Sequence, residues 1–178
     1  MKNSTKLVFA LALVALLAIF CVGTAFAETE APTATEPEKA TQDEIDELVA
    51  LTKTDLGGKL YEIDKLVIKA GETASFKNGY IVDTDSGKNN STIVNYGALT
   101  LEDVTVRGQG IVIYNLGVLE IKDNSVIGGS ATDSLASVSV FTGVNAATEN
   151  MPSTKLTSGT YFGSIIVENG YLASLEIS

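Results

Sequence analysis

The chain has 178 residues, with 22 acidic and 12 basic side chains and no histidine, which gives a formal net charge of −10 at pH 7. Nucleic acid and anionic membrane surfaces repel so acidic a protein, and the composition therefore excludes both as partners. Because Cys21 is the only cysteine, no intramolecular disulfide can form, and the fold has to be stabilised by packing.

The amino terminus has the features of a secretory signal peptide. Two lysines precede an apolar run over residues 7–22, and an Ala-Phe-Ala cleavage site ends at Ala27. A lipoprotein anchored through Cys21 is the alternative, but a lipobox requires a small residue before the cysteine, and Phe20 is bulky. The pattern predicts a secreted or cell-surface protein with a signal peptide at residues 1–27 and no membrane insertion after its cleavage.

A linker and a helix are expected next. Residues 28–40 are rich in Glu, Thr, Ala and Pro and have no large apolar side chain, so we expect an acidic, disordered linker. A short amphipathic capping helix is predicted over residues 41–55, with Thr41 as N-cap and Glu44 completing a capping box. The apolar residues expected on one face of this helix are Ile45, Leu48, Val49 and Leu51.

From residue 56 onward the chain shows short strands, each closed by Gly, Asn or Asp. Two stretches, residues 93–108 and 113–128, repeat each other without a gap, twenty residues apart. The recurring positions are Asn95 and Asn115, Gly97 and Gly117, Leu99 and Leu119, and Leu101 and Ile121. Self-similarity at a fixed period predicts a solenoid, in which each repeat buries its apolar face against its neighbours.

Stacking the repeats in parallel places equivalent residues about 4.8 Å apart. Val106 is then expected inside on Val126, and Glu102 outside on Lys122 as an opposite-charge pair. Residues 130–155 break the period and are expected to form an outward loop with one embedded strand. We therefore predict an all-β fold over residues 56–178, a single-stranded parallel β-helix of about six rungs.

The repeat also has a family likeness. The pattern Asn-x-Gly-x-Leu-x-[Leu/Ile]-x-Asp-x-[Thr/Ser]-Val-x-Gly, with Ser-Gly-Thr-Tyr-Phe-Gly at 158–163, resembles secreted bacterial right-handed parallel β-helix proteins. More narrowly, it is similar to the adhesin-like surface proteins of the pectate-lyase-like superfamily, over residues 41–178 and most clearly over 93–129. The resemblance implies a right-handed β-helix at a cell surface, and it implies no activity, because function on such a scaffold depends on individual sites.

Two pairs of stacked polar residues are candidate sites. Asn95 and Asn115 could present a ligand-binding amide ladder, but we favour a structural role, in which inward amides hydrogen-bond the corner backbone and each other. Asp103 and Asp123 could hold a calcium ion with help from Ser125 and Asn124. Calcium needs six to eight oxygen ligands, so we favour solvated turn carboxylates.

The Asp-Thr-Asp-Ser-Gly segment that starts at Asp83 resembles the opening of a calcium-binding loop. It fails the pattern, because Gly87 occupies the third ligand position and Val94 stands where the closing Glu belongs. We therefore interpret the segment as a polar turn.

A carbohydrate-active enzyme of the same fold, a polysaccharide lyase or a glycosidase, is the alternative function. Its candidate acids would be Asp83, Asp85, Asp103 and Asp123. The lack of histidine and the single arginine, Arg107, remove most bases, although two carboxyl groups at the right separation would suffice. We predict no catalytic residue and no cofactor, and a structural or adhesive module whose partners are glycans or another surface protein.

The carboxyl end, residues 171–178, reads as a strand that nothing caps. An open β-helix end presents unpaired backbone groups and bare apolar core, so solenoids normally carry a terminal cap. Either the sequence is a piece of a longer protein, which we favour, or a partner covers the last rung. For a piece of a longer protein we expect end-to-end self-association.

Overall fold

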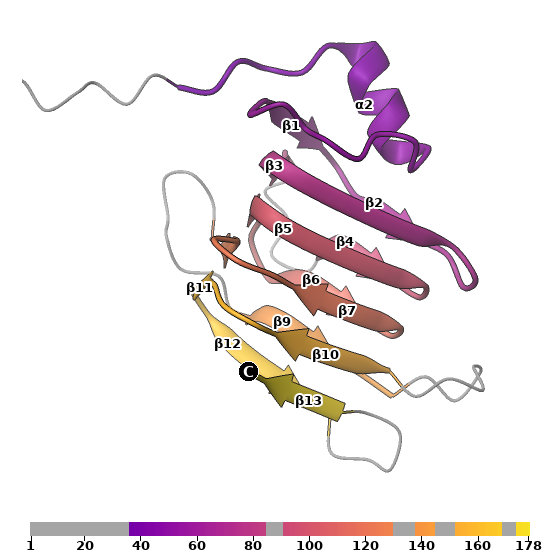
Figure 1. Ribbon diagram of the computed structural model, residues 1–178, viewed down its shortest axis with the longest axis vertical. Coiled ribbons are helices and arrows are strands. Elements are labelled where there is room, and N and C mark those ends of the chain that lie inside the picture. The colour runs from indigo at the N-terminus through magenta and orange to yellow at the C-terminus, as the bar shows by residue number, and fades with distance from the viewer. Residues whose placement is uncertain (1–35, 85–90, 130–137, 145–151, 169–173) are drawn as a thin grey trace, which may run out of the picture. The chain divides into compact units, whose positions relative to one another are not determined.

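The computed structural model describes residues 36–84, 91–129, 138–144, 152–168 and 174–178 (Figure 1). All of these except residue 36 belong to one compact unit, residues 37–178, which is mostly β with one short helix. The predicted signal peptide and residues 28–35 of the predicted linker lie outside the described residues. The end of the linker, predicted as disordered, is instead ordered, because the Leu60 N–H donates to the Glu38 carbonyl and the Ala40 N–H donates to the Leu60 carbonyl, each at 2.8 Å. No helix in the described part of the chain is long and apolar enough to cross a membrane.

The strands form two sheets in which every pair of neighbours is parallel. In sheet A the order is β1 (Leu60–Ile63), β3 (Thr73–Asp83), β5 (Ala98–Arg107), β7 (Val118–Ile121), β10 (Ser153–Leu156) and β13 (Ser174–Ile177). Two short strands join the same sheet, β8 (Val126–Gly128) beside β5 and β11 (Thr160–Tyr161) beside β8. In sheet B the order is β12 (Ser164–Val167), β9 (Val138–Thr142), β6 (Ile111–Asn115), β4 (Ser91–Asn95) and β2 (Leu66–Ile68).

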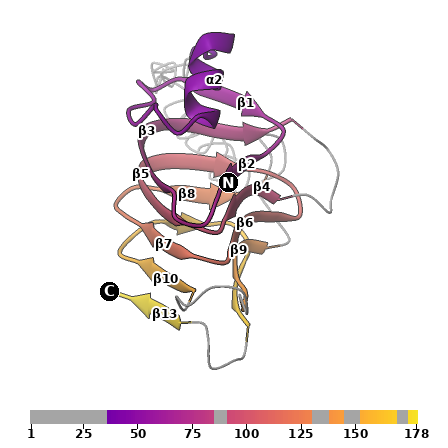
Figure 2. The same ribbon diagram turned by 90° about the vertical axis from the view of Figure 1, so that its right-hand side faces the viewer.

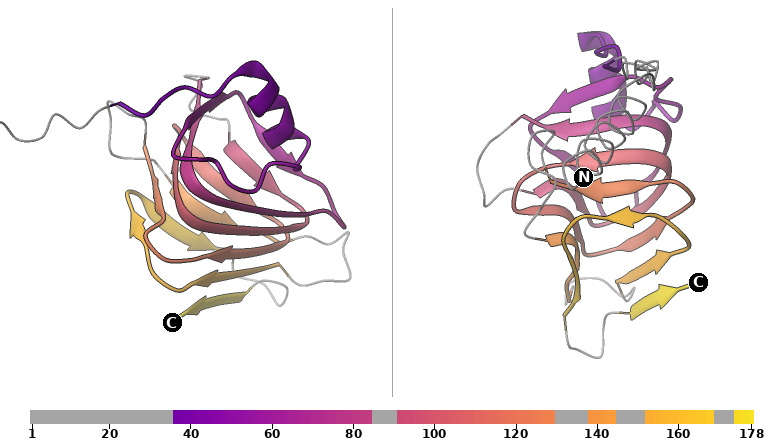
Figure 3. Two further views of the ribbon diagram at one scale, coloured as in Figure 1. Left: turned by 45° about the horizontal axis from the view of Figure 1, so that its top comes forward. Right: turned by 90° about the vertical axis from the view of Figure 1, so that its left-hand side faces the viewer.

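The chain passes back and forth between the two sheets. The chain runs from β1 in sheet A to β2 in sheet B and returns to sheet A in each coil, where β8 and β11 follow β7 and β10 within the same sheet, so neighbours within a sheet are one coil of the chain apart. Figures 2 and 3 show the resulting layers between α2 (Gln42–Val49) at one end and β13 at the other. Parallel strands cannot be joined by tight hairpins, so each pair of neighbours in a sheet is connected by a longer crossover segment.

Equivalent apolar side chains stack between the sheets. In sheet A, Leu99 pairs with Leu119, and Leu101 pairs with Ile121, and all four are buried. In sheet B, the buried residues Leu66, Ile93, Ile113 and Val140 follow one another across four strands. Each fully buried Leu or Ile side chain contributes about 1.5–3 kcal/mol relative to an exposed one, so the stacked rows supply most of the stabilisation.

The register corrects one predicted stack. Val106 pairs with Ile127, not with Val126, so the offset lengthens from twenty to twenty-one residues within this coil. The extra residue is taken up at the bend, where Asp103 (φ 54°) and Asn124 (φ 58°) both have left-handed backbone. An ungapped comparison of the repeats misses this slip, because Val126 and Ile127 are both apolar.

Two further expectations about coils were wrong. Lys122 Nζ lies 3.6 Å from Glu120 Oε2 on its own coil, rather than pairing with Glu102 of the coil before. Residues 153–155, expected within a loop, belong to β10 and pair with β7. Both predictions failed because the partner of the Lys122 side chain and the pairing of β10 depend on tertiary packing and not on the sequence repeat.

The capping helix is also shorter than predicted. α2 ends at Val49, because Leu51 (φ 60°) has left-handed backbone and its N–H donates to the Leu48 carbonyl at 3.0 Å. The Thr52 N–H donates to the Glu47 carbonyl at 2.9 Å, which completes a Schellman-type end with leucine where glycine is usual. The helix packs on β1 through buried Leu48, whereas Val49, predicted on the apolar face, is 51% exposed.

Candidate functional site

Asn95 and Asn115 form a buried, hydrogen-bonded ladder at the corner where strands of sheet B end. Asn95 Nδ2 donates to Asn115 Oδ1 at 2.8 Å and to the Val118 carbonyl at 2.9 Å. The Gly97 N–H donates to Asn95 Oδ1, and the Gly117 N–H donates to Asn115 Oδ1, each at 3.1 Å. Both side chains are fully buried, so their amides satisfy backbone groups of the corner instead of facing solvent.

The ladder continues into the next coil through residues that the sequence comparison missed. Asn115 Nδ2 donates to the Ser153 carbonyl at 2.9 Å and to Thr154 Oγ1 at 3.1 Å. Thr154 Oγ1 also hydrogen-bonds Thr142 Oγ1, and both threonines are buried. Thr142 pairs with Asn115 in sheet B, but its different residue type and the irregular spacing before it hide the equivalence in the sequence.

Glycine is required at the corner because successive turns touch. A Cβ at Gly97 would lie 2.3 Å from the Glu72 carbonyl oxygen, and one at Gly117 would lie 2.1 Å from the Gly97 carbonyl oxygen. Backbone cannot yield as a flexible side chain can, so any larger residue would separate the coils.

A surface hollow of about 210 Å³ lies over these turns. It is lined by three successive turns, residues 70–73, 96–98 and 116–118. Tyr96 is 39% exposed there, and Glu72 Oε2 accepts a hydrogen bond from the Lys69 N–H at 2.7 Å. The asparagine ladder holds two of the lining turns from below, so the hollow is preformed.

The hollow has the chemistry of a small binding site. Binding sites are concave and combine apolar or aromatic surface with a few fixed polar groups. Tyr96, with an apolar ring and a polar tip, and Glu72, with a carboxylate that its turn hydrogen bond holds in place, are both among the lining residues. A neutral ligand with apolar C–H faces and several hydroxyl groups matches this combination.

Asp103 lies at the bend within β5, and Asp123 lies at the corresponding bend between β7 and β8, but the register slip places Asp103 level with Asn124, so the predicted stack on Asp123 is off by one residue. The Asp103 N–H donates to the Asp123 carbonyl at 2.9 Å, and Ser158 Oγ donates to Asp123 Oδ1 at 2.7 Å. Ser125, predicted as a possible additional calcium ligand, is fully buried, and its Oγ accepts a hydrogen bond from the Val104 N–H at 3.4 Å. Ser125 therefore faces the core instead of joining the aspartates.

Of the other two candidate acids, the structure describes only Asp83. Asp83 ends β3 and is half-buried, whereas Asp85 lies outside the described residues. Within the residues that the structure describes, no three Asp, Glu, His or Cys side chains gather as metal ligands would.

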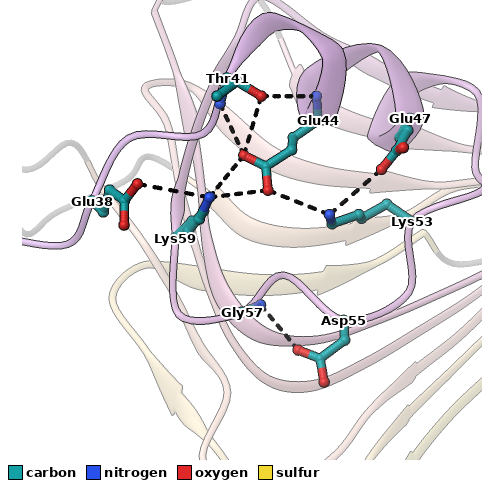
Figure 4. Close-up of polar contacts among 8 residues, drawn as sticks. All are labelled: Glu38, Thr41, Glu44, Glu47, Lys53, Asp55, Gly57 and Lys59. Carbon is teal, nitrogen blue, oxygen red and sulfur yellow. Dashed lines mark hydrogen bonds and ion pairs between the residues drawn. The ribbon is translucent and has the colours of Figure 1, made fainter.

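The densest charge cluster is at the helix cap, where sequence reasoning identified only the capping box (Figure 4). The Thr41 N–H donates to Glu44 Oε2 at 3.0 Å, which closes the box. The same carboxylate accepts from Lys59 Nζ at 3.0 Å through each oxygen and lies 3.5 Å from Lys53 Nζ. Glu38 Oε1 also lies 3.7 Å from Lys59 Nζ. No sequence spacing indicates that Lys53 and Lys59 converge on one carboxylate.

These contacts perturb the acid–base behaviour of the cap. The Thr41 backbone hydrogen bond, followed by the hydrogen bond from Lys59, lowers the pKa of Glu44 from 4.5 to about 2. Burial raises the pKa of Tyr61, whose ring is fully buried on β1 beneath this cluster and whose hydroxyl has no hydrogen-bond partner. The cluster therefore fastens α2 to the segment that leads into β1.

Comparison with known proteins supplies no function for this geometry. No family model, curated protein or solved structure that was compared with the chain matches it. Function has to be argued from the two sheets, the corner hollow and the sequence pattern of the amino terminus.

Proposed function

We propose that residues 56–178 form a right-handed, single-stranded parallel β-helix, similar to the adhesin-like proteins of the pectate-lyase-like superfamily. Parallel pairing throughout, alternation between two sheets and stacked equivalent side chains support this proposal. A helix over the first strand supports it as well, because solenoids require covered ends.

We further propose that the module is secreted and acts at the cell surface as a structural or adhesive unit that binds glycans. The signal-peptide pattern of residues 1–27 supports secretion, and mass spectrometry of the exported protein should find a chain that begins at Glu28. The observation that carries glycan binding is the corner hollow, whose lining residues include Tyr96, which is 39% exposed, and Glu72, whose carboxylate is held by the Lys69 N–H.

Glycans fit this hollow better than charged ligands do. A sugar ring presents a C–H face that packs on an aromatic ring and hydroxyl groups that donate to a carboxylate. The chain is strongly acidic, so it repels acidic polysaccharides and favours neutral ones. The expected ligand is therefore a neutral glycan, one sugar of which occupies the hollow.

A glycan screen on the secreted chain tests the proposal. Tyr96→Ala should abolish the binding of every glycan retained by the unchanged protein. Tyr80→Ala is the matched control, because Tyr80 is 37% exposed on β3, away from the hollow, and binding should persist. Equal binding by both variants, or no glycan retained by the unchanged protein, would refute the proposed site.

A further inference from the structure

The outer face of sheet B lacks charge. None of its five strands contains Asp, Glu, Lys or Arg, although the chain has 22 acidic and 12 basic residues. The strands of sheet A contain both signs. A charge-free area on a protein of net charge −10 is where a second molecule of equal charge can approach with least repulsion.

This face also has a continuous apolar row that crosses all five strands. Val67, Val94, Tyr114, Phe141 and Ile166 occupy paired positions in β2, β4, β6, β9 and β12. Val67 is 40% exposed and Ile166 is 37% exposed, and the three residues between them are half-buried. The rings of Tyr114 and Phe141 contact each other with centroids 5.3 Å apart. Aligned apolar side chains on an outer sheet face are typical of an interaction surface.

The two halves of the row differ in side-chain size, and charged residues of opposite sign lie near its two ends. Small Val67 and Val94 lie on one side of Tyr114, and larger Phe141 and Ile166 lie on the other. Exposed Lys69 comes two residues after Val67, and exposed Glu168 comes two residues after Ile166. Glu168 Oε2 accepts a hydrogen bond from the Val144 N–H at 3.0 Å, which holds the carboxylate near the edge of sheet B.

One two-fold arrangement uses both features. If two copies meet face to face about an axis along β6, the order of strands is reversed and their direction is kept. Each Val67 then opposes Ile166 of the other copy, Val94 opposes Phe141, and Tyr114 meets its equivalent at the axis. Lys69 of one copy comes beside Glu168 of the other. An axis along the stack of strands would instead place Val67 on Val67, reverse the strand direction and bring Lys69 of one copy opposite exposed Lys65 of the other.

We propose that the outer face of sheet B is a self-association surface, on which a second copy of this chain packs about a two-fold axis along β6. With strands about 4.8 Å apart and residues about 3.3 Å apart, the face covers about 400 Å² per copy. Stable interfaces bury about 800 Å² per partner, so the dimer is weak and forms only at high concentration. This proposal is independent of the glycan hollow and goes beyond it.

Sedimentation equilibrium on the chain from Glu28, which contains the whole compact unit, measures the association. The unchanged chain should pass from monomer to dimer as its concentration approaches the millimolar range. Tyr114→Asp should weaken the dimer at least tenfold, because it places a charge at the axis. Thr100→Asp adds the same charge to the half-buried outward side of sheet A and should leave association unchanged. Circular dichroism establishes that both variants are folded.

A charge exchange tests the two-fold axis without touching the apolar row. Lys69→Glu alone should weaken the dimer, and combination with Glu168→Lys should restore it, because the pair is then opposite in sign again. A chain that stays monomeric at millimolar concentration overturns the proposal. Equal weakening of association by Tyr114→Asp and Thr100→Asp would also overturn it, and would indicate end-to-end contact instead. So would loss of glycan binding in Tyr114→Asp if the unchanged protein never forms a dimer.

Discussion

Sheets A and B have the same inner construction and different outer faces. Inside, both sheets stack buried aliphatic residues on equivalent residues of the next coil. Outside, sheet B has no charged residue, whereas sheet A has many. The charged residues in the strands of sheet A are Glu62, Lys77, Asp83, Glu102, Asp103, Arg107, Glu120, Lys155 and Glu176. Core packing selects the inner positions of both sheets in the same way, so the two sheets differ only in their outer positions.

The charges of sheet A are suited to solvent. Lys155 Nζ lies 3.8 Å from Glu176 Oε1, and Lys77 Nζ lies 3.6 Å from Asp55 Oδ2, with all four side chains largely exposed. Exposed ion pairs of this kind contribute little to stability, typically below about 1 kcal/mol. Their effect is to keep the outer side of sheet A hydrated, which leaves sheet B as the face suited to contacts between proteins.

The largest expected effect contrasts the two sides of sheet A at adjacent residues. Leu119 is 1% exposed and Val118 is 45% exposed. Leu119→Asp should unfold the protein, because burying an unpaired carboxylate costs several kcal/mol against a total stability of about 5–15 kcal/mol. Val118→Asp should cost less than about 1 kcal/mol. Urea denaturation followed by circular dichroism measures both, and similar losses would contradict the inward and outward assignment.

The next effect concerns the corner that joins the two sheets. Asn115→Ala removes the acceptor of the Gly117 N–H and the donor to the Ser153 carbonyl, and leaves buried groups unpaired. Each such group costs about 1–3 kcal/mol, so we expect a loss of about 2–4 kcal/mol. Asn124→Ala, at an exposed left-handed bend, is the control and should cost about 1 kcal/mol. Equal losses would show that the ladder is dispensable.

The inner construction was predictable from the sequence because it depends on local repetition. Leu99, Leu119, Leu101 and Ile121 are apolar at a constant offset, and this pattern predicts which side of the strand is buried. The slip at Asn124 was not predictable, since a bend can absorb one residue without changing the apolar pattern on either side. The apolar row of sheet B was also missed, because it becomes visible only when five short strands are placed in register.

The site was less predictable than the fold. The roles of Asn95 and Asn115 follow from their position at a glycine corner, which the sequence shows. Tyr96 and Glu72 belong to different turns that line one hollow, and no spacing rule in the sequence relates them. The cap cluster around Glu44 depends equally on how the chain after the helix returns to β1.

The charge cluster at the helix cap provides a test that depends on pH. The pKa of Glu44 is about 2 in the folded chain, below its ordinary value of 4.5. The stability that this carboxylate contributes is therefore complete above about pH 4.5 and is lost as the pH falls towards 2. Glu44→Gln should lower the melting temperature by a few degrees at pH 7. It should also reduce the fall in melting temperature between pH 4.5 and pH 2. Glu102→Gln, on the exposed outer side of sheet A, should leave the decline unchanged, and a decline unaltered by Glu44→Gln would contradict the role of the cap.

The smallest expected effect concerns calcium at the bend of sheet A. Asp103 and Asp123 are neighbours, but Ser158 already donates to Asp123 and Ser125 faces the core. Calcium requires six to eight oxygen ligands, and two carboxylates with solvent bind it loosely by charge alone. Millimolar calcium should therefore raise the melting temperature by no more than a degree or so, and Asp123→Asn should remove most of that rise. Tight one-to-one binding in calorimetry, abolished by Asp123→Asn, would instead establish a specific metal site on the charged face.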